Sequence, residues 1–352
     1  MAVFEPEAEG VVLDAEEARG EIVGRSPWEL AGRRLLRNKI ALAALGLFIL
    51  IVVISFAAPL YASHVAHTDP FASNISGTIT IDGKKRDILQ QGGGKLGIGE
   101  TPIGPTWHAK YFIGADNQGR DVAARVLYGG RSSLIIGIGS ALLCCLLAVI
   151  VGLMAGFFGG FTDTALSRLM DLLWAFPVYL LAICLATVLI ARTKPLQILF
   201  FTIHPSSLWI PLLIIGIIYV PYVYRPIRGQ VLSLRQKEFV EAAIAQGASN
   251  WRLMLSEILP NVASTVIVLL PLMIATTILT ESALSLLGLG VHDPQASWGT
   301  IIQDGQALLY TRPWVAIVPG IFIVLTVLSL NILGDGVRDA LDPRAKVRIG
   351  AE

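Results

Sequence analysis

Six long apolar runs constrain the fold of this chain more than any other feature of its sequence. Each run offers about 20 mostly apolar residues, the length that an α-helix needs to cross a bilayer. The runs lie at residues 40–61, 132–158, 168–191, 208–224, 262–288 and 314–334. They are too long for strands, and polar and apolar residues do not alternate within them. A content of 54% hydrophobic and 15% charged residues supports the same conclusion. The sequence therefore predicts an all-α membrane protein with six transmembrane helices.

Lysine and arginine near the ends of the runs predict the side of the membrane that each loop occupies. Basic residues gather before the first run, between the fourth and fifth runs, and after the sixth run: Arg25, Arg33, Arg34, Arg37, Lys39, Arg225, Arg228, Arg235, Lys237, Arg252, Arg338, Arg344, Lys346 and Arg348. The short loops on the other side hold only Arg192, Lys194 and Arg312. Since cytoplasmic loops carry the excess of basic residues, we expect both termini and the loop at 225–261 in the cytoplasm.

The remaining segments divide the chain further. Residues 1–25 hold seven acidic residues and few large apolar ones, which predicts a disordered cytoplasmic tail. Residues 26–39 predict an amphipathic helix on the inner membrane surface. The first span, 40–61, is followed by an extracytoplasmic insertion at 62–131. The five-helix core at 132–334 includes the 225–261 loop, and a cytoplasmic tail is expected at 335–352.

The insertion at 62–131 predicts a small external subdomain. Ile79 to Ile81, Asp82-Gly83 and Lys84 to Leu89 read as a short β-hairpin, because Asp-Gly suits a tight turn between two strands. Gly92-Gly93-Gly94-Lys95 is followed by Leu96, so it lacks the Ser or Thr of a phosphate-binding loop. The sequence therefore offers no nucleotide site there.

The cytoplasmic loop at 225–261 is polar and rich in helix formers. The segment 238–260 predicts a helix, a turn at Gly247, and a second helix from Trp251 to Leu259 that Pro260 ends before the fifth span. At helical spacing, Trp251, Leu255, Ile258 and Leu259 would share an apolar face. Two interpretations remain open: the hairpin packs on its own bundle, or the apolar face docks into a groove of a partner.

Short motifs in this loop resemble the EAA loop of ABC-importer permeases. The matching residues are Glu241-Ala242-Ala243, Gly247 and Leu259-Pro260. Four further segments resemble the C-type subunit of dipeptide and oligopeptide permeases, so the resemblance covers residues 26–348: Trp28 to Pro59, Gly114 to Arg131, Leu287 to Gly299, and Leu333 to Arg344. The pattern departs from the family at two places. The isoleucine position of the motif holds Glu257, with Ile258 one residue later, and Ala115 stands where threonine is common.

The resemblance implies a type I ABC importer permease fold in the bacterial cytoplasmic (inner) membrane. It implies import of di- and oligopeptides, with a B-type permease, two ATP-binding subunits and an extracytoplasmic solute-binding protein as partners. ATP and Mg²⁺ would be bound by the ATPase subunits, and no cofactor by this chain. The residues implied to couple the permease to the ATPase are Glu241, Ala242, Ala243, Gly247, Ile258, Leu259 and Pro260. Alternative functions are import of nickel, glutathione or another small solute, or secondary transport without an ATPase.

Other candidate sites are few. No constellation of catalytic residues is present, which predicts a non-catalytic subunit, and nothing points to a nucleic-acid partner. His64, His67 and Asp69 could bind a metal, but solvated loop histidines are the preferred interpretation, and we expect no metal site. Glu281 in the fifth span is either a contact for a peptide amino group in the translocation path or gate, or a carboxylate hydrogen-bonded to a neighbouring helix.

One ion pair is also expected near the inner end of the third span. Arg168 and Asp171 lie one helical turn apart, which favours a structural pair between them.

Overall fold

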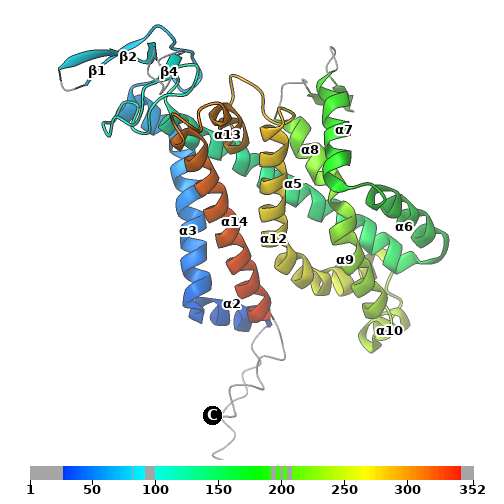
Figure 1. The fold of residues 1–352 in the computed structure, drawn as a ribbon. Helices are drawn as coiled ribbons and strands as arrows, with labels where there is room; N and C mark the ends of the chain where they lie inside the picture. The colour runs from blue at the N-terminus through cyan, green and yellow to red at the C-terminus, as the bar shows by residue number, and fades with distance from the viewer. Residues whose placement is uncertain are drawn as a thin grey trace, which may run out of the picture.

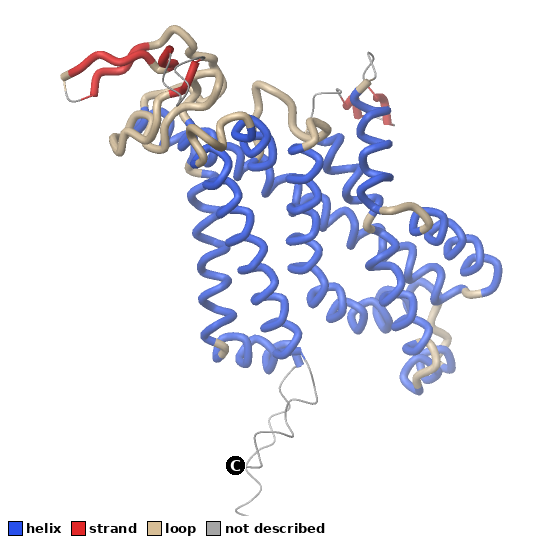
Figure 2. The backbone as a smooth tube through the Cα atoms, viewed as in Figure 1, coloured by secondary structure: helices blue, strands red, loops and turns tan. Residues whose placement is uncertain are grey.

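The structure is a computed structural model that describes residues 27–81, 83–91, 100–191, 196–198, 201–203 and 208–341. The described chain is mostly helical, and its short strands lie in connecting segments (Figures 1 and 2). The predicted tail at 1–25 lies outside the described residues, as do Gly92 to Lys95.

Four helices of the described chain are long and apolar enough to cross a membrane unaided. They are α3 (Lys39–Phe56), α5 (Val122–Phe158), the continuous helix Asn250–Leu286, and α14 (Trp314–Leu341). The second begins ten residues before the predicted span at 132, because Asp121 caps it. The Asp121 carboxylate accepts hydrogen bonds from the backbone N–H groups of Ala123 and Ala124. The apolar run shows which part of α5 suits lipid, but it does not show where the helix begins.

Two further apolar segments are bent pairs of helices. Helices α6 (Gly160–Trp174) and α7 (Val178–Ile190) meet at 87°, and α8 (Trp209–Ile218) and α9 (Val220–Leu234) meet at 42°. The prediction of a single helix over 168–191 is therefore wrong. Pro177 disfavours helical backbone at the preceding Phe176, so the chain turns there. If each bent pair is one span, the described chain has six.

The helices pack around two apolar clusters that share α5. One cluster involves α5, α7, α8, α9 and α12 (Leu259–Leu286), and the other involves α3, α5, α12, α13 (Trp298–Gln306) and α14. Figure 1 shows α5 crossing the molecule behind α12, with α3 and α14 side by side at one flank. Hydroxyl groups also join helices. Thr277 of α12 donates to the carbonyl oxygen of Gly137 at 2.7 Å, and Ser140 of α5 donates to that of Leu212 at 2.9 Å. Such bonds satisfy polar groups where no water is present.

The connecting segments occupy opposite ends of the helix bundle. At one end lie α4 (Ala58–Leu60), the π-helix η1 (Tyr61–Ala66), and four strands: β1 (Thr78–Ile81), β2 (Lys84–Asp87), β3 (Leu89–Gln91) and β4 (Glu100–Pro102). The predicted hairpin is confirmed by the antiparallel pairing of β1 with β2, in which Ile81 faces Lys84. Two more short strands, β5 (Leu196–Ile198) and β6 (Phe201–Ile203), pair between α7 and α8.

The other end carries α2 (Pro27–Arg37), the C-terminal end of α14, and α10 (Glu238–Ala245) (Figure 1). Helix α14 continues to Leu341, so the prediction of a tail from 335 is wrong for residues 335–341. The helix continues past its apolar part because α14 packs there against α2 and α3. A Cβ added at Gly336 would lie 2.5 Å from Ala41 Cβ and 3.6 Å from Leu35 Cδ1. Residues 342–352 lie outside the described chain.

Candidate functional site

The segment 238–260 forms a helix–turn–helix that projects from the bundle. Helix α10 ends in a Schellman motif around Gly247, whose φ is +79°. The N–H of Gly247 donates to the carbonyl oxygen of Ile244 at 2.9 Å, and the N–H of Ala248 donates to that of Ala243 at 3.0 Å. The second helix begins at α11 (Asn250–Arg252), where Ser249 is the N-cap. The predicted turn at Gly247 is thus present, and its left-handed backbone explains the glycine.

The hairpin has one buried face and one exposed face. Its buried side chains belong to the larger apolar cluster, and none is more than 2% exposed: Val240, Leu253, Met254 and Ile258. The opposite surface presents four large apolar side chains to the outside, each between 41% and 68% exposed: Phe239, Ile244, Trp251 and Leu255. Glu241 and Ala242 are exposed beside them. We call these four apolar residues the hairpin surface. An anchored hairpin with an exposed apolar side fits a groove on another protein.

The second half of the hairpin differs from the prediction in two ways. Pro260 does not end the helix, because a π-helical turn, η2 (Leu253–Ile258), leads directly into α12 with Pro260 in its first turn. Proline is tolerated there, since the first-turn N–H groups of a helix lack helical partners. The predicted common face of Trp251, Leu255 and Ile258 is also wrong. The wide π turn shifts the helical register, so Ile258 is fully buried while Trp251 is 68% exposed.

Helix α9, which leads into the hairpin, is bound to α6 by polar contacts. The Arg228 guanidinium forms a two-bond ion pair with Asp163, with Nη2 lying 2.6 Å from Oδ2. Arg225 lies 3.3 Å from Asp171 and stacks over the Trp174 ring at 4.0 Å. The prediction that Asp171 pairs with Arg168 is wrong, because the Arg225 side chain reaches Asp171 from α9. A displacement of α9 therefore pulls directly on α6.

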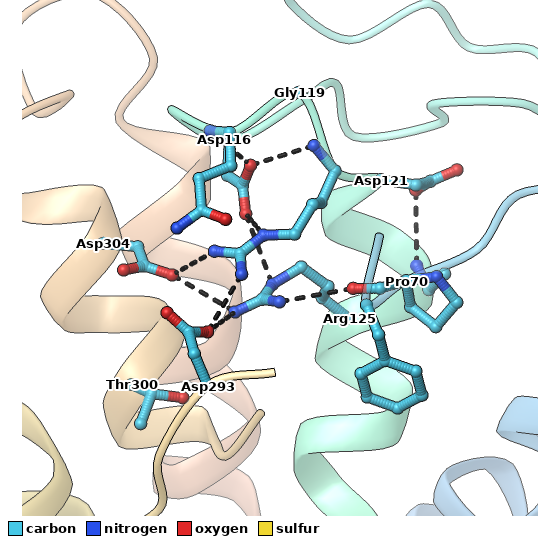
Figure 3. A network of polar contacts seen from close by, with 12 residues as sticks. Pro70, Asp116, Gly119, Asp121, Arg125, Asp293, Thr300 and Asp304 are labelled. Carbon is cyan, nitrogen blue, oxygen red and sulfur yellow. Dashed lines mark hydrogen bonds and ion pairs between the residues drawn. The ribbon is translucent and has the colours of Figure 1, made fainter. Parts of the chain in front are cut away.

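A second group of charges lies at the end that carries β1–β4. Arg120 and Arg125 are both 1% exposed and converge on three carboxylates, those of Asp116, Asp293 and Asp304 (Figure 3). Arg120 lies 2.7 Å from Asp116, 2.9 Å from Asp293 and 2.9 Å from Asp304. We call these five residues the ion cluster. It joins the segment before α5 to the α12–α13 loop and to α13.

Burial and ion pairing oppose one another in the ion cluster. It lowers the pKa of Arg120, but the carboxylates of Asp116, Asp304 and Asp293 outweigh this effect, and the pKa is raised overall. Burial likewise raises the pKa of Asp304, although the two arginines oppose it. The buried charges are thus paired with one another, as charges away from water must be.

Glu281 lies in α12 towards the same end and is fully buried. Its carboxylate accepts hydrogen bonds from the hydroxyl groups of Ser133 in α5, at 2.8 Å, and Ser285, at 2.7 Å. This arrangement matches the second interpretation, a carboxylate hydrogen-bonded to a neighbouring helix. A contact between Glu281 and cargo would require these bonds to open, and it stays a prediction.

Residues 148–347, more than half of the chain, match the family model described as binding-protein-dependent transport system inner membrane component. The chain belongs to this family. It is therefore a membrane permease subunit of an ABC importer, a system that also contains ATPase and binding-protein partners. Residues 26–76 match a second model, described as the N-terminal TM domain of oligopeptide transport permease C.

Similar permeases carry several substrate names. The oligopeptide transport system permease protein OppC of Haemophilus influenzae is 34% identical over 92% of this chain and 91% of its own length. The dipeptide transport system permease protein DppC of Alkalihalophilus pseudofirmus is 35% identical over 91% of each chain. The glutathione transport system permease protein GsiD of Pectobacterium atrosepticum is 34% identical over 92% of this chain and 93% of its own. Among solved structures, an inward-facing form of the MetNI methionine ABC transporter aligns with 61% of this chain and 96% of its own, with a TM-score of 0.48 and 15% identity.

Some of the residues predicted to couple this permease to an ATPase lie together on the hairpin. Glu241, Ala242 and Gly247 lie on the exposed side of the hairpin, and Ala243 is half-buried. Ile258 is buried beneath the hairpin, Leu259 is half-buried and Pro260 is exposed at the start of α12. Ile258 therefore contributes an anchor, and Phe239 and Ile244 join the exposed surface without having been singled out by the motif.

The ion cluster of the permease was not predicted from the sequence. Its members are separated by up to 188 positions, from Asp116 to Asp304, so no local spacing reveals them. The available signal was the density of charge between 116 and 125, beside an apolar span. The predicted histidine pair forms no comparable centre. His64 accepts or donates one hydrogen bond with Ser63, and in the described part of the chain no three His, Cys, Asp or Glu side chains could hold a metal ion.

Proposed function

We propose that this permease imports di- and oligopeptides as a C-type subunit, and that the 238–260 hairpin couples it to a separate ATPase. The observation that carries the coupling is the hairpin surface: Phe239, Ile244, Trp251 and Leu255 are exposed on a hairpin whose other face is anchored in the core. Such a surface on a charged, membrane-adjacent loop supports docking to a partner groove. The proposal includes Glu241, Ala242, Ala243 and Gly247 as residues of the docking segment.

The proposed assembly follows from the same arrangement. The end that carries α2, α10 and the C-terminal part of α14 faces the cytoplasm, which is supported by its arginines and lysines. Two ATP-binding subunits hold the ATP and Mg²⁺ there, and this chain binds no cofactor and performs no chemistry. A B-type permease completes the pore, and a solute-binding protein delivers cargo at the opposite end.

The proposed mechanism is alternating access driven by nucleotide. ATP closes the ATPase dimer, the hairpin moves with it, and α9 transmits the motion to α6 through the Arg228–Asp163 and Arg225–Asp171 pairs. The ATPase needs only to favour one of two arrangements of the bundle, because the permease itself supplies both states.

Peptides are the proposed cargo because residues 26–76 match an oligopeptide permease module and two of the similar permeases are named for peptides. The similarity to GsiD makes glutathione the comparator that the test must include. We expect a strain that lacks this permease gene to lose uptake of labelled di- and oligopeptides and to regain it on complementation. Loss of glutathione or nickel uptake alone would reassign the cargo. Uphill transport by the purified chain in liposomes, with only an ion gradient, would overturn the ATPase-coupled function.

The turn at Gly247 offers a test of the hairpin. No heavy atom lies within 4 Å of a Cβ added there, so Gly247→Val strains the backbone without a side-chain clash. A left-handed backbone costs an ordinary residue about 1–2 kcal/mol, which should misalign α10 and the second helix. We expect reduced uptake and weaker co-purification of the ATPase, with normal membrane insertion. Gly247→Asn is the control, since asparagine tolerates this conformation. Equal loss in both variants would exclude turn geometry as the cause.

A further inference from the structure

The loop between α12 and α13, residues 287–297, is exposed at its start and at residues 293–295, and buried at 290–291 and 296–297. Val291, Ser297 and the adjoining Trp298 are buried, whereas Asp293 to Gln295 are exposed. The loop passes over the end of α12 and over α5, at the same end of the molecule as the β-strands (Figure 1). Its exposed middle is bound through Asp293 to Arg120 of the ion cluster at 2.9 Å.

Two serines that share one carboxylate hold this loop at two backbone amides. Just after the loop, the backbone N–H of Trp298 donates to Ser133 Oγ at 3.2 Å. Within the loop, the backbone N–H of Val291 donates to Ser285 Oγ at 3.1 Å. Each serine hydroxyl in turn donates to a different oxygen of Glu281, Ser133 to Oε2 and Ser285 to Oε1.

This order of donors fixes the direction of every bond. A serine hydroxyl has one proton, and once that proton is donated to Glu281 the oxygen is left to accept from the loop. The carboxylate is the single group that receives both protons. Without the carboxylate, nothing orients the two serine oxygens towards the loop amides. Two buried hydroxyl groups would also lose their acceptor.

The loop backbone also sits directly on α12, which independently shows how closely the two are matched. A Cβ added at Gly290 would lie 2.8 Å from Ser285 Cα, and one added at Gly299, in the first turn of α13, would lie 2.7 Å from Ser285 Cβ. Only glycine allows the backbone this close to Ser285 at both positions. The hydrogen bonds through Ser285 therefore depend on a close fit between loop and helix.

We propose that Glu281 is a positioning residue that holds the 287–297 loop against α5 and α12, at the Trp298 amide through Ser133 and at the Val291 amide through Ser285. The loop is then fixed at three points, at Val291 and Trp298 by Glu281 and at Asp293 by Arg120. In the proposed function, on which this role in transport rests, the loop edges the outer side of the pore. Opening that edge requires the Val291 and Trp298 amides to leave the two serines.

Amide hydrogen exchange in the assembled transporter in nanodiscs tests this directly. Ser133→Ala should accelerate exchange about tenfold at the Trp298 amide and leave Val291 unchanged, while Ser285→Ala should do the reverse. Glu281→Ala should accelerate both. Glu281→Gln retains one carbonyl oxygen that can accept a serine proton, so we expect an intermediate result. Ser282→Ala is the matched control, because Ser282 lies 3.5 Å from Glu281 and holds no loop amide among the described bonds.

The pattern of exchange separates positioning from a general loss of structure. Wild-type exchange at both amides in Glu281→Ala would overturn the proposal, and so would uniform acceleration along the whole of α12. If Glu281→Ala fails to assemble, the two serine variants still test the proposal. Faster exchange at both amides in either serine variant would contradict it, because each serine is expected to hold only its own amide. The readout does not depend on cargo, so failure of peptide uptake with the exchange pattern intact would reject the proposed function and leave this inference standing.

Discussion

Replacing Arg120 with alanine should destabilise the permease by about 3–5 kcal/mol, the usual cost of removing one partner from a buried ion pair. Asp116 is 1% exposed and accepts its shortest charged contact, 2.7 Å, from Arg120. Arg125, at 3.3 Å, would be the one charged partner left to its carboxylate among the described residues, and Asp293 and Asp304 would each lose a 2.9 Å contact. A lower midpoint of thermal unfolding in detergent, measured by the fluorescence of the tryptophans, would show this.

A surface pair provides the control for Arg120. Arg33 forms an ion pair with Glu29 at 2.9 Å, but both side chains are about half exposed. Exposed pairs contribute at most about 1 kcal/mol, so Arg33→Ala should leave the unfolding midpoint almost unchanged. If Arg120→Ala and Arg33→Ala shift the midpoint equally, the ion cluster does not hold the loops together.

Replacing Trp251 with glutamate should abolish ATP-driven uptake while the permease still folds. Trp251 is 68% exposed in the isolated chain and is the largest residue of the hairpin surface, so its replacement costs this chain little packing. A buried aromatic anchor at an interface commonly contributes about 2 kcal/mol or more, which corresponds to roughly 30-fold weaker binding. A charge placed there adds a desolvation cost. The measurement is the affinity of the detergent-solubilised permease for its ATPase subunits.

Tyr310 offers a matched aromatic control at the other end of the molecule. It is 99% exposed and lies between α13 and α14, away from the hairpin. Tyr310→Glu should therefore leave ATPase affinity unchanged. Normal ATPase affinity in Trp251→Glu would remove the hairpin surface from the interface, whatever its effect on uptake.

The positions of the helices could be predicted from the sequence better than the points where they bend or continue into one another. The apolar runs located the spans because lipid imposes their length, but hydropathy does not report where a helix bends. Pro177 explains the 87° bend once the structure shows it, whereas Pro260 and Pro271 lie within one continuous helix. The same residue type therefore gave opposite outcomes. Only the neighbouring turns, such as η2, decide between them.

In the candidate sites, local features could be predicted from the sequence and long-range contacts could not. The turn at Gly247 could be predicted because its cause is local, a left-handed residue at a helix end. The Glu281–Ser133 contact and the contacts of the two arginines with Asp293 and Asp304 join residues 148 to 184 positions apart, so they depend on how α5 packs against α12 and α13. Sequence reasoning placed Glu281 in a span and left two interpretations open, because its partners lie on another helix.

The continuous helix Asn250–Leu286 gives the two ends of the molecule a common moving part. Its 37 residues have a length along the helix of about 55 Å, and Figure 1 shows the helix bending at the lower end of α12. Trp251 stands near its first residue and Glu281 near its last. Under the proposed coupling, a displacement of the hairpin by the ATPase is transmitted along this helix to the opposite side of the membrane. No relay of intervening contacts is needed, and timing between the two rims is set by the stiffness of a single element.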